Sequence, residues 1–101
     1  MISKKSKIFI AGHNGMIGSA ILRKLQELKY KKIYTIDRSK LDLRDQSKVY
    51  KYLKKIKPNA VIIAAAKVGG IKANNTQKAD FIFDNLSIQN NLIHGSFKVG
   101  V

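Results

Sequence analysis

The sequence has 101 residues, 45% hydrophobic and 26% charged, a composition typical of one small globular unit and unlike that of a disordered chain. It contains no cysteine, which excludes disulfides, thiolate metal sites and a cysteine nucleophile. The net charge is +14, but 17 of the 20 basic residues are lysines spread along the chain. Such a surface favours loose, salt-sensitive adhesion to polyanions, and we expect no specific nucleic-acid recognition.

No segment of the sequence predicts a membrane span or a signal peptide. The longest uninterrupted apolar run, Ala60 to Ala66, is far too short to cross a bilayer. Residues 1–7 are basic but lack the apolar stretch and cleavage site of a secretory leader. We therefore expect a cytoplasmic protein that has no membrane partner.

The first part of the chain predicts a strand, a helix and a second strand. Lys7 to Ala11 is a short run rich in β-formers that ends at a glycine, which is typical of a buried strand. Apolar residues then recur at helical spacing from Ile17 to Leu28. Lys32 to Asp37 is a second β-branched run, so a β-α-β unit is expected.

A second helix is predicted between Asp45, a plausible N-cap, and the break at Pro58-Asn59. Val49, Leu53 and Ile56 would form its apolar face.

The rest of the chain predicts a third strand, a loop and a long helix. Ala60 to Ala66 is apolar throughout, which suits a strand covered on both faces. Gly69-Gly70 and Asn74-Asn75 mark a loop. Residues 78–98 can form one helix, and its apolar positions, most simply part of the core, are Phe81, Leu86, Ile88, Leu92 and Ile93.

This alternation predicts an α/β fold: a partial Rossmann-type, doubly wound parallel sheet in three α/β/α layers. A doubly wound sheet would continue with a fourth strand. We therefore expect residues 1–101 to be the N-terminal part of a dinucleotide-binding domain, without the remainder of that domain or a substrate domain. We also expect an unpaired, aggregation-prone outer edge on the first strand and a marginally stable or self-associating chain.

The segment from Gly12 to Gly18 reads G-x-x-G-x-x-G, directly after the first strand and at the start of the first helix. In such a motif, Gly12 permits the tight turn, Gly15 lets a pyrophosphate approach the backbone, and Gly18 allows the helix to pack on the strand. The free amides and the helix dipole then favour phosphate. The β-α-β context indicates a dinucleotide site.

Two neighbouring residues make opposite predictions about the cofactor. Asp37 follows Gly18 by 19 residues, near the usual spacing of the carboxylate that bonds the ribose of NAD. Arg38 could instead pair with the 2′-phosphate of NADP, which a carboxylate would repel. The residues alone leave NADP and NAD both open.

Several segments resemble a known enzyme family. The segments from Gly12 to Ile21 and Leu41 to Leu43 resemble the extended short-chain dehydrogenase/reductases. The segments Ala64 to Ile71, Ala73 to Thr76 and Ala79 to Ile82 are similar, more specifically, to the GDP-L-fucose synthase family. That family epimerises GDP-4-keto-6-deoxy-D-mannose at carbons 3 and 5 and then reduces its 4-keto group with NADPH.

The resemblance implies a cofactor site with NADP as the cofactor and Arg38 at its 2′-phosphate. The residues that it places around the cofactor are Gly12, His13, Asn14, Gly15, Met16, Ile17, Gly18, Arg38, Leu41, Asp42, Leu43, Ala64, Ala65, Ala66 and Lys67. Two positions depart from the family pattern. Asn14 stands where some members carry a second arginine, and Asp37 stands where many carry a neutral residue, so NAD stays an alternative.

The resemblance also implies a GDP-sugar substrate and a homodimer formed through the helices on one side of the fold. It places the catalytic serine, tyrosine and lysine beyond residue 101, so we assign no catalytic residue and expect no catalysis by this chain alone. Alternatives are another extended nucleotide-sugar epimerase or reductase, and a non-catalytic nucleotide- or polyanion-binding module.

The remaining motifs carry little chemistry. Tyr50 and Lys54 match Tyr-x-x-x-Lys, but with 17 lysines such a match is expected by chance, and we interpret the pair as part of a helix surface. His13 is expected to make a local structural hydrogen bond, and His94 to pack or face solvent. The acidic residues show no convergent pattern for a metal.

Overall fold

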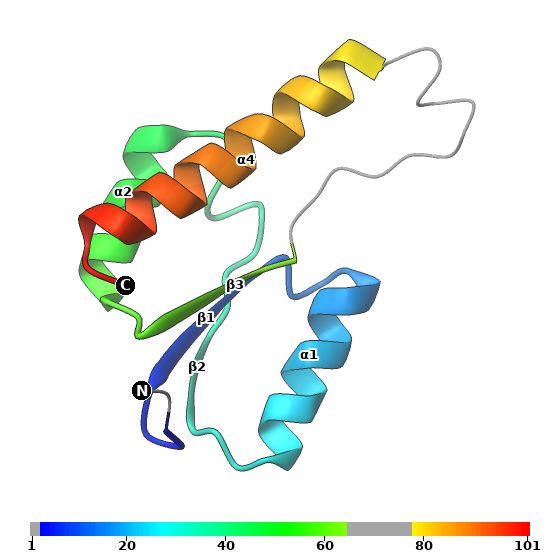
Figure 1. Cartoon of the computed structure of the whole chain (residues 1–101). Coiled ribbons are helices and arrows are strands. Elements are labelled where there is room, and N and C mark those ends of the chain that lie inside the picture. The colour runs from blue at the N-terminus through cyan, green and yellow to red at the C-terminus, as the bar shows by residue number, and fades with distance from the viewer. Residues whose placement is uncertain (1–2, 65–77) are drawn as a thin grey trace.

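The computed structural model describes residues 3–64 and 78–101, with side chains from 85 onward in the last helix. Strands and helices alternate along the chain (Figure 1). In chain order they are β1 (Lys7–Ala11), α1 (Met16–Glu27), β2 (Lys32–Tyr34), α2 (Gln46–Ile56), β3 (Ala60–Ile63) and α4 (Lys78–Lys98).

The described strands form a three-stranded parallel sheet in the order β2-β1-β3. Phe9 of β1 lies opposite Tyr34 of β2 on one side and Val61 of β3 on the other. The expectation that β1 has an unpaired outer edge is therefore wrong. After β2 the chain crosses over to the other side of β1, where it forms β3. β1 is therefore central, and β2 and β3 are the outer strands.

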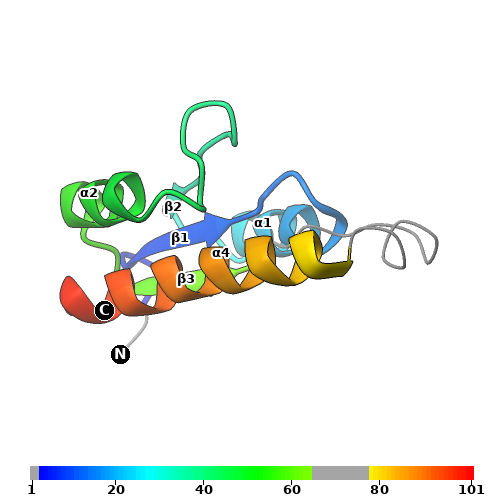
Figure 2. The same ribbon diagram turned by 90° about the horizontal axis from the view of Figure 1, so that it is seen from above.

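Helices cover both faces of the sheet, as the alternation predicts (Figures 1 and 2). α1 lies on one face, and α2 and α4 lie side by side on the other. This change of face accompanies the change of direction from β2 to β3, because right-handed crossovers in opposite directions place their helices on opposite faces. The fold is a Rossmann-type α/β/α arrangement, which confirms the predicted class.

The core lies mainly between the sheet and the pair α2 and α4. Phe9, Leu53 and Leu92 are completely buried there, and the Phe9 ring meets the Tyr52 ring edge-on at a centroid distance of 5.2 Å. By contrast, Gly18 is the only residue of α1 that is fully buried. The predicted apolar face of α1 is therefore only partly covered.

The ends of α2 agree with the sequence. The Asp45 side chain accepts a hydrogen bond from the Lys48 amide at 3.1 Å, which satisfies one of the free first-turn donors. Lys57, in the left-handed conformation with φ of 47°, ends the helix before Pro58. Val49 and its predicted neighbours on the apolar face are buried.

The second strand is shorter than predicted. β2 pairs with β1 only as far as Tyr34, and residues 35–37 continue beyond the ladder. The Asp37 carbonyl then accepts the amides of Lys40 and Leu41, which starts a turn. The β-branched run predicts extended backbone but cannot indicate where the partner strand ends.

α4 has the bounds predicted from the sequence, but its apolar residues divide between two faces. Ile88 and Leu92 are buried against the core, whereas Leu86, Ile93 and Phe97 are 53%, 60% and 77% exposed. A purely core role for these positions is therefore wrong for Leu86 and Ile93. The Phe81 side chain and the loop predicted near residues 69–75 lie outside the described residues. In the described part of the chain, no helix has the length and apolarity needed to cross a membrane.

Candidate functional site

The glycine loop turns the chain from the end of β1 into the start of α1. Gly12 adopts φ of +92°, a conformation that favours glycine. The Gly15 amide donates to the Gly12 carbonyl at 3.2 Å, and the Ser19 amide donates to the Gly15 carbonyl at 2.9 Å. Gly15 is the N-cap of α1 and has no side chain that could accept hydrogen bonds from the first-turn amides. These amides are therefore available to bind an anion.

Gly15 and Gly18 are needed for different reasons. A Cβ atom on Gly18 would lie 1.9 Å from the Gly12 carbonyl oxygen, so only glycine allows α1 to pack this close to the loop. A Cβ on Gly15 would meet its nearest atom at an ordinary 3.6 Å. The chain's own packing therefore does not require glycine at position 15, and the open space there fits a ligand that approaches the backbone.

The loop forms one wall of a hollow at the carboxyl end of the sheet. Seven of the predicted site residues line this hollow: Gly12, His13, Asn14, Gly15, Arg38, Leu41 and Leu43. The hollow is also lined by Phe9, Ala11 and Ile36, which belong to strands or a strand extension and were not predicted as site residues. Their apolar runs indicated core, and no sequence signal separates a core position from the floor of a hollow.

The other predicted site residues lie around this hollow or outside the described structure. Met16 and Ile17 are exposed in the first turn of α1, and Gly18 is buried beneath the loop. Ala64 donates its amide to the Ala11 carbonyl at 2.8 Å, so the end of β3 lies beside the end of β1. The predictions for Ala65, Ala66 and Lys67 fall outside the described residues.

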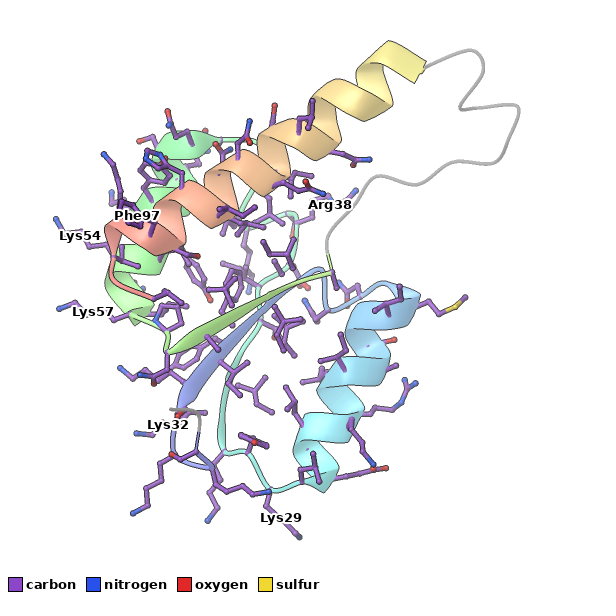
Figure 3. All side chains as sticks on the ribbon, viewed as in Figure 1. Lys29, Lys32, Arg38, Lys54, Lys57 and Phe97 are labelled. Carbon is purple, nitrogen blue, oxygen red and sulfur yellow. The ribbon has the colours of Figure 1, made fainter. Side chains whose placement is uncertain are left out.

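Asp37 and Arg38 are adjacent in the chain but differ in their contacts, and only Arg38 lines the hollow. The Asp37 carboxylate accepts a hydrogen bond from Asn14 Nδ2 at 3.3 Å and lies 3.5 Å from His13 Nε2. The His13 side chain thus contacts a residue that follows β2, whereas the sequence predicted a local hydrogen bond. Arg38 lines the hollow and lies near the carboxyl ends of the strands, far from Lys54 and Lys57 (Figure 3).

Asp42 does not face the hollow, because its carboxylate is held by Arg44. The Arg44 guanidinium donates from Nε and Nη2 to the two carboxylate oxygens at 3.0 Å each, and the Arg44 amide donates to Oδ1 at 2.9 Å. The side-chain hydrogen bonds from Arg44, followed by the one from its amide, lower the pKa of Asp42. Asp42 shapes the segment that carries Leu41 and Leu43.

Asn91 of α4 also positions this segment. Its Nδ2 donates to the Leu43 carbonyl at 3.0 Å, and the residue is 8% exposed. The hydrogen bond joins the long helix to the wall of the hollow. The sequence analysis missed Asn91, although a polar residue between the apolar positions Ile88 and Leu92 was a usable signal.

Tyr50 belongs to α2, and its side chain contacts α4 and does not line the glycine-loop hollow. Its hydroxyl is 2.5 Å from His94 Nδ1 and accepts a hydrogen bond from Gln46 at 3.2 Å. The His94 ring in turn stacks on Phe97 at a centroid distance of 6.5 Å. These contacts indicate that Tyr50 packs between two helices. The sequence predicted only that it would be part of a helix surface together with Lys54. No metal-binding cluster of acidic or histidine side chains occurs among the residues described.

A parallel α/β sheet with a glycine turn between its central strand and the next helix defines a dinucleotide-binding domain of the Rossmann type. Residues 8–101 match the family described as the NAD dependent epimerase/dehydratase family. The chain belongs to this family.

Relatives of known name are considerably longer than this chain. GDP-L-fucose synthase of Sinorhizobium fredii is 55% identical over 95 residues, covering 94% of this chain and 30% of that protein. GDP-L-fucose synthase 1 of Arabidopsis thaliana is 52% identical over 101 residues, covering 100% and 31%. The chain thus spans less than a third of the length of these relatives.

Solved structures agree with this assignment. The GDP-mannoheptose C4 reductase MlghC of Campylobacter jejuni, solved with NADP bound, superimposes with a TM-score of 0.95 at 42% identity. That match covers 100% of this chain and 32% of the reductase.

Proposed function

We propose that this chain is the cofactor-binding part of an NADPH-dependent GDP-sugar epimerase/reductase of the GDP-L-fucose synthase type. The observation that carries the proposal is the meeting of the glycine loop and Arg38 around one hollow at the carboxyl end of the sheet. Open α/β sheets bind their ligands at this edge. The identities of 52% and 55% to GDP-L-fucose synthases support the choice of substrate class.

The residues of the hollow have distinct roles in this proposal. The first-turn amides of α1 hold the pyrophosphate, which can approach because Gly15 has no side chain. Arg38 pairs with the 2′-phosphate, and Leu41 and Leu43 border the adenine. The strand ends, including Ala64, flank the nicotinamide half. When bound, NADPH supplies the hydride that reduces the 4-keto group.

We further propose that the complete enzyme adds strands, the catalytic residues and a substrate domain to residues 1–101. Among the described residues β3 is an outer strand, so its free edge can accept another parallel strand, and the matched relatives are about three times as long. The chain by itself then binds cofactor without turnover. Adding NADPH and the keto sugar should leave the nicotinamide absorbance constant. Steady oxidation of NADPH would contradict the proposal that this chain binds the cofactor without turnover.

A second candidate is a C4 reductase that acts on another GDP sugar without epimerisation. The TM-score of 0.95 and the 42% identity to the GDP-mannoheptose C4 reductase support this candidate. Chromatography of the products made by the full-length enzyme discriminates the two. GDP-L-fucose formed from the 4-keto-6-deoxymannose precursor supports the first function, and reduction without inversion at carbons 3 and 5 supports the second.

We also propose that α4 contributes to a homodimer. Leu86, Ile93 and Phe97 follow spacings of seven and four residues, so they share a helix face opposite the buried Ile88 and Leu92. Replacing Ile93 by glutamate should shift the protein from dimer to monomer in sedimentation equilibrium. The matched change Gln26→Glu, on exposed α1 surface, should leave the dimer intact. A chain that is monomeric at high concentration would argue against this interface.

The variant Gly15→Asp distinguishes a dinucleotide-binding enzyme domain from a polyanion-binding module. A carboxylate at position 15 would occupy the open space above the loop and repel pyrophosphate, so NADPH binding should be lost. Asn90→Asp, which makes the same charge change on exposed α4 surface, should bind NADPH normally. If Gly15→Asp still binds NADPH, and random-sequence nucleic acid binds with a steep salt dependence, the hypothesis of a polyanion-binding module is supported instead.

A further inference from the structure

The Asp37 carboxylate is tied to the glycine loop by two side chains. Asn14 Nδ2 donates to Asp37 Oδ1 at 3.3 Å, and His13 Nε2 lies 3.5 Å from the same oxygen. Both partners come from the turn between β1 and α1, whereas Asp37 follows β2. The carboxylate therefore lies against the glycine loop, and the Asp37 side chain is 56% exposed.

Arg38 is the adjacent residue and has different surroundings. It lines the hollow, and its guanidinium makes no ion pair within the described residues 3–64 and 78–101. Since Asp37 and Arg38 are adjacent in the chain, a 2′-phosphate that pairs with Arg38 would experience the electrostatic field of the Asp37 carboxylate. The Coulomb energy between them depends strongly on where that carboxylate is held.

A free carboxylate at the end of this strand would favour NADH over NADPH. It could accept hydrogen bonds from both ribose hydroxyls of NADH, and it would repel the phosphate that replaces one of them in NADPH. A carboxylate that already accepts a hydrogen bond from Asn14 and lies beside His13 is less available for the ribose. The contact thus acts against NADH and in favour of NADPH.

We propose that Asn14 is a specificity-determining residue: by holding Asp37 against the glycine loop, it allows Arg38 to select NADPH. Asn14 acts through Asp37 and is a positioning residue in this respect. The inference rests on the proposed dinucleotide function but adds a cause of its selectivity. It also assigns Asp37 a role other than reading the ribose.

The test is a double-mutant cycle on the selectivity ratio, defined as the Kd for NADH divided by the Kd for NADPH. Asn14→Leu keeps the number of side-chain heavy atoms and removes the donor, so the ratio should fall about five- to tenfold, the size expected for one partly exposed hydrogen bond to a charged group. Asn14→Ala, as a second variant, should lower the ratio similarly. In the Asp37→Asn background, Asn14→Leu should change the ratio by less than about twofold, because the charge is absent.

Two results would overturn the inference while the proposed function stands. One is an unchanged ratio in both Asn14 variants, and the other is an equal fall with and without the Asp37 charge. A wild-type protein that binds neither dinucleotide would overturn the proposed function as well, and the wild-type titrations alone reveal that case. Thermal melts without ligand establish that each variant is folded before its affinities are compared.

Discussion

Gly15 and Gly18 belong to one motif, yet the structure predicts different consequences for their replacement by alanine. Gly18→Ala places a Cβ 1.9 Å from the Gly12 carbonyl oxygen, so α1 must move, at a cost of about 1–3 kcal/mol in the free energy of unfolding. The Cβ of Gly15→Ala makes only an ordinary contact, 3.6 Å from the Gly12 carbonyl oxygen, so the variant should change stability by less than about 1 kcal/mol. It should still weaken NADPH binding strongly, because the methyl group occupies the pyrophosphate approach. Denaturant melts and NADPH titrations of both variants measure the contrast, and equal destabilisation would contradict it.

The Asp42–Arg44 pair predicts a small pH dependence of stability. Its hydrogen bonds hold the pKa of Asp42 below the ordinary value of 3.8. A carboxyl whose pKa is lowered on folding adds stability above the unfolded pKa and loses it as the pH falls through the folded pKa. Asp42→Asn should therefore unfold more easily than wild type at pH 7, by less than about 1 kcal/mol because the pair is exposed. The two proteins should become equally stable as the pH falls below 3.8, and a gap that widens in acid would contradict this account.

At the residue scale, the sequence predicted most of the hollow's lining but not how its members interact. The motif spacing indicated Gly12 and Gly15, and the resemblance indicated Arg38, because each signal is local in sequence. The Asn14–Asp37 contact joins residues 23 positions apart. It depends on where β2 ends relative to the glycine loop. Nothing in either residue's neighbourhood along the chain encodes that distance.

Among the helices, α4 makes a contact that we expect to support both stability and binding. Replacing Asn91 by leucine removes the donor to the Leu43 carbonyl and leaves a buried acceptor without this partner, at a cost of about 1–3 kcal/mol. Because Leu43 lines the hollow, the affinity for NADPH should also fall. Asn90→Leu, on the exposed side of the same helix, should do neither. Thermal melts and NADPH titrations of both variants provide the measurement. Equal stability and equal NADPH affinity of the two variants would show that the hydrogen bond has no special role.

At the element scale, the type and order of the helices and strands followed from periodicity, because apolar spacing reports which face of an element is buried. The bounds of α4 and the N-cap at Asp45 were also predicted, since both depend on nearby residues. Two features could not be predicted this way. The short length of β2 and the central place of β1 depend on strand pairing, which local sequence does not specify.

For the whole molecule, the net charge of +14 predicts opposite effects of salt on stability and on binding. Raising NaCl from about 0.1 M to about 1 M shortens the Debye length from about 10 Å to about 3 Å, which screens repulsion among the lysines. The melting temperature should rise, whereas the affinity for NADPH should fall because its phosphates are screened as well. Sucrose at matched osmolality should not weaken NADPH binding. A melting temperature that falls in salt would contradict a dominant role of self-repulsion.

The most direct test of the central claim compares two ligands that differ only in the 2′-phosphate, adenosine 2′,5′-bisphosphate and 5′-AMP. Both are expected to occupy the adenine half of the proposed site, whose lining belongs to the described residues. The wild-type chain should bind the bisphosphate at least about tenfold more tightly, and Arg38→Ala should abolish that preference. Arg23→Ala, on the exposed surface of α1, should keep it. Equal affinity of the wild-type chain for both ligands, or an Arg38→Ala variant that retains the preference, would contradict an NADP site built on the glycine loop and Arg38.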